Sequence, residues 1–230
     1  MSNAEERRQF QQDYEEYKKM PGAETNVRMY PQLGQRTPKT HVDLFYFYQD
    51  TWAFKRIVEL RPKSVVDVGS TALLVGCIAQ MFPTISIDVR PLGVRLAGLT
   101  CKKASILDLP FADSSVELLS SLCVIEHIGL GRYDELLDPL GSVKALKEVA
   151  RVLQPGGHFI MSTNVSHKSG LCFNAHRIFT KPQVLAMLPG FSIVKEAFFF
   201  PQPNSEKRIN GLGDLRFFCV WCVDLVKQIE

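Results

Sequence analysis

Three aspartates close three consecutive apolar runs of the chain. Asp67 and Asp88 end the first and second runs, roughly 20 residues apart, and Asp108 ends the third. Gly69 follows the first run, in a turn where the backbone can approach a ligand closely. An acid at this spacing after the second strand of a nucleotide-binding fold accepts hydrogen bonds from a ribose diol. The pattern therefore predicts a ribose-containing ligand that is held by Asp88.

Further polar side chains follow a fourth and a fifth apolar run. His127 follows the fourth run and can exchange a proton near neutral pH, which makes it the candidate catalytic base. The alternative is that Glu126 and His127 form a structural pair beneath the ligand. The candidates for binding a polar or anionic substrate are Arg132, Tyr133, Asn164, His176 and Arg177. For Arg177 the alternative is an ion pair with a surface acid.

The elements that must position these side chains alternate between short apolar runs and helical patterns. Strands are predicted at residues 64–68, 84–88, 104–107, 116–122, 158–163, 191–199 and 215–223. Helices are predicted at residues 72–81, 92–99, 141–153 and 181–188. This alternation predicts an α/β fold with a doubly wound, mostly parallel seven-stranded sheet. Ligands bind such sheets outside the carboxyl ends of the strands, where the strand order reverses.

The segment before the sheet has a different pattern. A polar helix with Phe10, Tyr14 and Tyr17 on one stripe ends at Pro21, and a Pro-, Gly- and Thr-rich stretch follows through residue 40. A second helix is predicted from a capping box at residues 40–43 through Leu60. We expect residues 1–60 to form an N-terminal helical cap or lid and residues 61–230 to form the ligand-binding domain.

The motifs between Ser64 and Gly190, taken in order, resemble the class I S-adenosylmethionine-dependent methyltransferases of type 11. They read VVDVGS, SIDV, SILDLPFADSSVELL, EHI, ALKEVARVLQPGGHFIMST and RIFTKPQVLAML. The stretches EHIGLGRY and DP further resemble an uncharacterised subfamily of that group. The resemblance implies a Rossmann-like fold and the cofactor S-adenosyl-L-methionine, with S-adenosyl-L-homocysteine as product.

The resemblance also implies a set of cofactor contacts. It places the methionine part beside Asp67 and Gly69, the ribose on Asp88 and the adenine amino group on Asp108. The full set of implied cofactor contacts is Asp67, Gly69, Ser70, Asp88, Val89, Asp108, Leu109 and Glu126. The chain departs from the family where small residues usually follow the first glycine, because Thr71 and Leu73 stand there. We expect this loop to narrow the pocket.

A methyltransferase that acts on a small polar or glycan-like acceptor, at oxygen, is the resulting hypothesis. The alternative is a catalytically inactive protein of the same fold that serves binding or regulation, which the altered glycine loop favours. A nicotinamide-dependent enzyme is disfavoured, because no GxGxxG follows the first strand.

Composition excludes several other classes of protein. The 27 Lys and Arg are interleaved with 24 Asp and Glu for a net charge of +3, which does not favour nucleic acid. No apolar run approaches the roughly 20 residues that span a bilayer, and residues 1–20 lack the apolar core of a secretory signal, so a cytoplasmic location is expected. The six cysteines form no paired metal-binding array, and no metal is expected. Residues 198–200 and the last strand could form a homodimer contact or lie in the core.

Overall fold

The computed structural model describes residues 2–200 and 218–229, which form two compact units divided between Val42 and Asp43. The first unit holds α1 (Asn3–Tyr17), which begins at a capping box between Ser2 and Glu5 and buries none of its residues. A loop returns along this helix, since the Gly34 N–H donates to Glu6 and Arg36 pairs with Asp13. The role of residues 1–60 as a cap stays a prediction.

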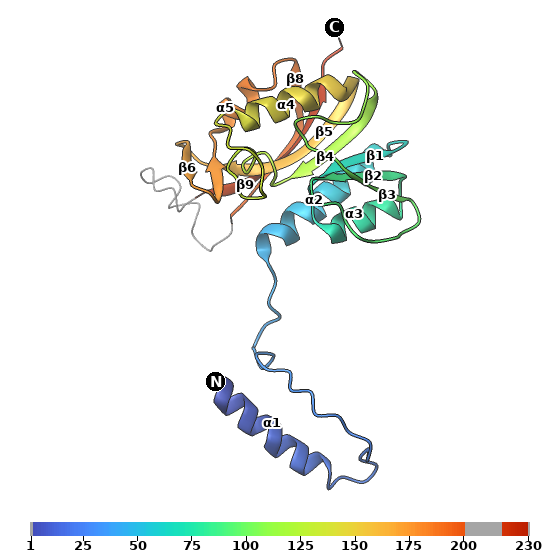
Figure 1. Cartoon of the computed structure of the whole chain (residues 1–230), viewed down its shortest axis with the longest axis vertical. Helices are drawn as coiled ribbons and strands as arrows, with labels where there is room; N and C mark the ends of the chain where they lie inside the picture. The colour runs from blue at the N-terminus through green and yellow to red at the C-terminus, as the bar shows by residue number, and fades with distance from the viewer. Residues whose placement is uncertain (1, 201–217, 230) are drawn as a thin grey trace. The chain divides into compact units, whose positions relative to one another are not determined.

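The second unit is built on one sheet of seven strands (Figure 1). The sheet order is β3-β2-β1-β4-β5-β9-β8. Within the described sheet β9 pairs antiparallel with β5 and β8, and the other four strand pairs are parallel, so the predicted doubly wound, mostly parallel sheet is confirmed. The strands are β1 (Val65–Val68), β2 (Thr84–Asp88), β3 (Leu99–Lys103), β4 (Val116–Leu122), β5 (Leu153–Val165), β8 (Phe191–Phe199) and β9 (Cys219–Lys227).

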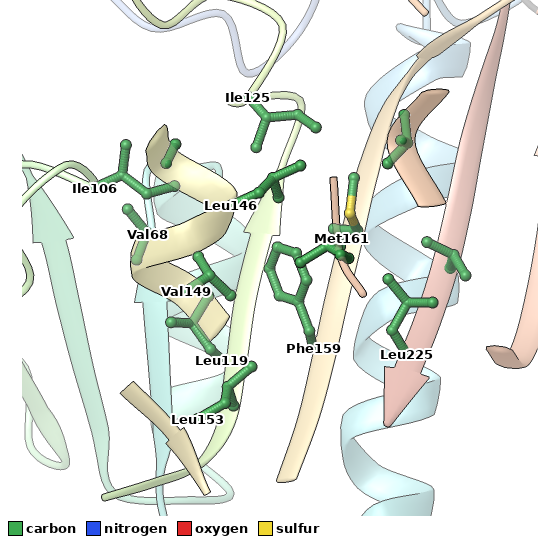
Figure 2. Packing of buried hydrophobic residues seen from close by; sticks show 14 of the residues in the cluster. Val68, Ile106, Leu119, Ile125, Leu146, Val149, Leu153, Phe159, Met161 and Leu225 are labelled. Atoms are coloured by element: carbon green, nitrogen blue, oxygen red, sulfur yellow. The ribbon is translucent and has the colours of Figure 1, made fainter. Parts of the chain in front are cut away.

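Helices cover both faces of this sheet, because alternate strand residues point to opposite sides. On one face α4 (Gly141–Val152) and α5 (Lys181–Ala186) pack in a cluster with Phe159 and Met161 of β5. Figure 2 shows Leu146 and Val149 of α4 above the strands that carry Leu119 and Phe159. On the other face α2 (Leu44–Leu60) and α3 (Ala72–Ala79) pack against the intervening residue of β5, Ile160.

The helix starts follow local capping chemistry. The carboxylate of Asp43 accepts the N–H groups of Phe45 and Tyr46, so α2 begins at Asp43 and the predicted box at Thr40 is wrong. The hydroxyl of Thr71 accepts the N–H of Leu74 and begins α3 directly after the first strand turn. The turn at residues 69–71 is therefore held between the end of β1 and the capped start of α3.

The predictions at residues 92–99 and 104–107 are wrong. No helix forms at 92–99, where Gly98 (φ +79°) packs so closely on the Ala79 carbonyl that a side chain would clash. The strand lies earlier, at β3, where exposed and half-buried residues alternate because it is the edge strand. The apolar residues 104–107 instead form a turn. Asp108 therefore stands five residues beyond the end of β3 and is exposed.

The remaining differences are shifts of element ends. β5 spans Leu153–Val165 and so extends beyond both ends of the strand predicted at 158–163. β9 spans Cys219–Lys227, whereas the prediction was 215–223. Residues 215–217 of that prediction lie outside the described residues. A short hairpin, β6 (Gly170–Cys172) with β7 (His176–Ile178), was not predicted. The described residues contain no helix that could span a membrane and no cluster of three metal-ligating side chains.

Candidate functional site

A cleft opens over the carboxyl ends of β1, β2 and β4, where the strand order reverses. It consists of a smaller hollow of about 130 Å³ and a larger one of about 430 Å³. The two hollows share six lining residues: Gly69, Asp88, Arg90, Cys123, His127 and Tyr133. This position is where a sheet of this kind binds ligands, so the cleft is the candidate site.

The turn after β1 forms the floor between the hollows. Gly69 has a φ of +71°, and a β-carbon there would lie 3.0 Å from Val124 Cγ2. Asp67 holds the turn from below, since its Oδ1 accepts the Ser70 N–H at 3.1 Å and its Oδ2 accepts the Ser120 hydroxyl at 2.6 Å. Asp67 is fully buried and lines neither hollow, and this burial raises its pKa to about 6. Ser70 lines the larger hollow.

We expect Gly69→Ala to lower both stability and ligand binding. The substitution forces a left-handed backbone on alanine and places its methyl group against Val124. A loss of about 1–2 kcal/mol in the free energy of unfolding is expected. Denaturant unfolding measures this loss, and Gly190→Ala, at φ +80° in the same unit with no heavy atom within 4 Å of an added β-carbon, controls for backbone strain alone. Equal losses in the two variants would contradict a close packing of the Gly69 turn.

The loop after Gly69 does not close the cleft as expected. Leu73 is 78% exposed and lines neither hollow, because it lies on the outer side of α3. Thr71 does line the larger hollow, but its hydroxyl caps α3 and donates to Asp50 Oδ2 at 2.6 Å. The expected narrowing by Leu73 is therefore wrong.

The end of β2 brings one of the three aspartates to the cleft. Asp88 lines both hollows, and its Oδ1 accepts the N–H of Arg90 at 2.7 Å. Val89 lines the smaller hollow. The other wall of that hollow is the turn after β3, through Ser105, Ile106 and Leu107.

Asp108 and Leu109 lie elsewhere than the resemblance implies. Neither lines the cleft: Asp108 is exposed, and Leu109 is 2% exposed in the core, with its N–H donated to Glu148 at 2.8 Å. The structure therefore brings together Gly69, Ser70, Asp88 and Val89 and leaves these two residues apart.

The end of β4 adds a thiol that the sequence analysis did not single out. Cys123 lines both hollows with a φ of +52°, and its Sγ donates to Gln49 Oε1 at 3.0 Å. The Ser162 hydroxyl donates to the same Gln49 oxygen at 2.9 Å. Burial raises the pKa of the Cys123 thiol well above its usual value, so the thiol is protonated and not nucleophilic at neutral pH. The sequence feature that could have indicated this contact is Gln49, a polar residue on the mostly apolar face of α2.

Glu126 and His127 both reach the cleft, in different states. Glu126 is fully buried against the larger hollow, and burial raises its pKa to about 7. Burial lowers the pKa of His127 to about 4, so its ring is neutral at neutral pH. His127 Nδ1 lies 2.7 Å from the Ala175 carbonyl oxygen, which makes Nδ1 the nitrogen that carries the proton. A ring of this low basicity is a poor general base near neutral pH.

The rim of the larger hollow is cationic and aromatic. The guanidinium carbons of Arg90 and Arg132 lie 4.4 and 5.2 Å from the centre of the Tyr133 ring. Glu135 holds this loop in place by accepting the N–H groups of Leu130, Gly131 and Tyr133 at 2.7–3.1 Å. Asn164 and His176 also line this hollow, as do Phe45, Tyr46, Leu122 and Phe218.

Arg177 does not reach the cleft. Its guanidinium donates to the carbonyl oxygens of Ile128 at 2.5 Å and Asp138 at 3.1 Å, and to the Ser142 hydroxyl at 3.2 Å. These bonds tie β7 to the start of α4, which is a structural role. The alternative prediction, that Arg177 pairs with a surface acid, is also wrong, because its guanidinium donates to backbone carbonyl oxygens.

Comparisons with known proteins place the fold. The family described as "Caenorhabditis protein of unknown function, DUF268" matches residues 109–214, and no curated protein matches the chain. A Bacillus halodurans protein assigned as a methyltransferase superimposes with a TM-score of 0.55 at 13% identity, covering 76% of this chain and 99% of the other. An S-adenosylmethionine-dependent methyltransferase from Methanosarcina mazei gives 0.53 at 15% identity, covering 76% and 98%. The cyclase SpnF gives 0.54 at 16% identity, covering 79% and 81%.

Proposed function

The chain has the fold of the S-adenosylmethionine-dependent methyltransferases, and we propose that it is an enzyme of that class. The observation that carries the proposal is the pairing of Asp88 with Gly69 at the reversal of strand order. A β-carbon at Gly69 would lie 3.9 Å from Asp88 Oδ2, so the missing side chain leaves room beside the carboxylate. A carboxylate there can accept both hydroxyls of a ribose.

Four residues would hold the cofactor in this proposal. Asp88 accepts from the ribose, Gly69 and Ser70 present backbone to the methionine part, and Val89 packs beside the ribose. The adenine ring lies against the turn at 105–107, whose residues line the smaller hollow. When bound, S-adenosyl-L-methionine supplies an activated methyl group, so this chain needs chiefly to align the acceptor. Asp67 acts as a positioning residue for the turn and does not contact the ligand.

The acceptor would bind in the larger hollow. Its lining of Arg132, Tyr133, Asn164 and His176 is polar and suits a small polar or glycan-like molecule. We further propose that methylation occurs at oxygen and that the protein is cytoplasmic. We also propose a homodimer through the edge strand β8 and a cap formed by residues 1–60. His127, neutral and bonded to Ala175, would orient the acceptor as a hydrogen-bond partner.

Calorimetric titration with S-adenosyl-L-methionine and S-adenosyl-L-homocysteine tests the proposal. We expect the protein to bind both ligands with micromolar affinity. Asp88→Ala should weaken binding roughly ten- to hundredfold, because a charged hydrogen bond in the cleft is lost. Asp113→Ala removes an exposed carboxylate that pairs with Arg151 outside the cleft, and it should leave affinity unchanged.

The opposite outcome supports a different function. Absence of binding by well-folded protein would contradict the enzyme and favour a binding or regulatory protein of the same fold. Asp108→Ala separates two placements of the adenine: unchanged affinity supports contact with the turn at 105–107, and a tenfold loss supports the contact implied by the family resemblance.

A further inference from the structure

Two buried polar atoms, from residues that line the larger hollow, have no hydrogen-bond partner among residues 2–200 and 218–229. They are Glu126 Oε1 and His176 Nε2, and the described side chains contain only one other such atom, Arg56 Nε. Glu126 follows β4 and His176 begins β7, so two separate elements bring them to one hollow. Buried polar groups are almost always paired, because an unpaired one forfeits the hydrogen bond it had with water. Their shared position therefore points to a ligand that supplies the partner.

The chemistry of Glu126 defines the partner. Its Oε2 accepts the Thr163 hydroxyl at 3.0 Å, and its Oε1 is buried with no hydrogen-bond donor among the described residues. Arg132, a cation that also lines the hollow, donates instead to the Ala175 carbonyl oxygen at 3.1 Å. A fully buried carboxylate oxygen in this position is satisfied by a group that donates a hydrogen bond, and best by one that also carries positive charge.

We propose that Glu126 and His176 form a subsite that binds a hydroxyl or protonated amine of the methyl acceptor, beside the position of the transferred methyl group. The subsite rests on the proposed function. It assigns Glu126 to the acceptor and away from the cofactor contacts that the resemblance implies. It also names a class of acceptor: an alcohol or amine whose reacting atom carries a hydrogen. An amine that binds as its ammonium form must release a proton before its nitrogen can accept the methyl group.

The surroundings of Glu126 allow its carboxyl to ionise in the working range. Burial raises its pKa to about 7, and hydrogen bonds from its own backbone N–H, the Thr163 hydroxyl and the Cys123 thiol, together with the charge of Arg132, oppose this rise. The other titratable groups that face it are the protonated Cys123 thiol and the rings of His127 and His176, whose pKa values are both lowered by burial. All three are therefore neutral at pH 8, where the carboxylate is charged. A ligand ammonium beside Glu126 would meet the negative charge of that carboxylate.

Sinefungin tests the subsite, because it carries an amino group where the sulfonium sulfur carries the methyl. We expect wild-type protein at pH 8 to bind sinefungin at least tenfold more tightly than S-adenosyl-L-homocysteine, measured by calorimetry. Glu126→Gln should reduce this preference to within about twofold while leaving the affinity for S-adenosyl-L-homocysteine nearly unchanged. Glu117→Gln, the same substitution at the opposite end of β4, is the matched control and should keep the full preference.

A second measurement needs no variant. Lowering the pH from 8 to 5.5 protonates Glu126, so the preference of the wild-type protein for sinefungin should fall several-fold. A preference that is absent at pH 8, independent of pH or retained in Glu126→Gln would overturn the subsite. If neither compound binds, the proposed function itself fails. If both bind with equal affinity, the function stands and only the subsite fails.

Discussion

Replacing Asp224 by alanine is expected to lower the free energy of unfolding by about 3–5 kcal/mol. Asp224 lies on β9 with no exposed surface, and its two oxygens accept from Arg56 at 2.6 Å and from His158 at 2.7 Å. The substitution leaves the guanidinium of Arg56, which is 9% exposed, without its buried partner. Its remaining partner is Glu59, on the half-exposed outer side of α2.

Urea unfolding followed by circular dichroism measures the loss. Glu59→Gln is the matched control, because it removes the outer partner of the same arginine and should cost much less. The double variant Arg56→Leu/Asp224→Leu should recover most of the stability, since an apolar pair can replace a buried ion pair at little cost. A single-variant loss as small as that of the control would show that Arg56 does not depend on Asp224.

Strands and helices that are buried on both faces or strongly amphipathic could be predicted from the sequence. The central strands predicted at 84–88 and 116–122 match the structure, and the helix predicted at 141–153 ends one residue earlier. Central parallel strands read as apolar runs because both of their faces are covered. The mostly parallel sheet followed from the order of these runs.

The edge strand β3 could not be predicted in the same way, whereas the other edge strand, β8, has the bounds predicted for it, because apolar residues lie at both of its ends. β3 carries two lysines and a threonine, so it has no apolar run, whereas the neighbouring turn buries Ile106 and Leu109. An apolar pattern reports burial rather than strand geometry, and the turn was mistaken for the strand. The error moved Asp108 to a strand end, where its carboxylate would have faced the cleft.

Within the site, the spacing along the chain located the residues that the backbone itself positions. Gly69 directly follows β1 and Asp88 is the last residue of β2, so the strands implied their place at the carboxyl ends of the sheet. The roles of Arg177 and Cys123 depend on partners far away in the sequence, Asp138 and Gln49, and no local pattern encodes such pairs. The separation of Asp67 from the cleft likewise depends on Ser120 of the adjacent strand.

The fold alone does not decide the chemistry, as the similarity to the cyclase SpnF illustrates. The proposed function requires an open cleft with a carboxylate at the end of the second strand. In this chain Leu73 lines neither hollow of the cleft and Asp88 lines both. The altered glycine loop is therefore compatible with ligand binding, which the calorimetric experiment decides.

We expect Asp67 to lower the free energy of unfolding as the pH rises from 4 to 6. Burial raises its pKa from 3.8 to about 6 in the folded state. Between these values the folded protein holds a proton that the unfolded chain has released, so raising the pH favours unfolding. The stabilising contribution is complete below pH 4 and is lost as the pH passes 6, a change of about 3 kcal/mol.

Asp67→Asn isolates this effect, because the amide can keep both bonds: its oxygen accepts the Ser70 N–H and its NH₂ group donates to the Ser120 oxygen. Relative to wild type, we expect the variant to gain about 2–3 kcal/mol of unfolding free energy between pH 4 and pH 7.5, measured by urea unfolding at each pH. Asp113→Asn, at an exposed carboxylate, should show little such gain. A difference between Asp67→Asn and wild type that stays constant with pH would mean that Asp67 ionises in the folded protein as it does in the unfolded chain. The carboxylate would then be solvated or paired with a cation, and the turn at Gly69 would be more open than its packing against Val124 indicates.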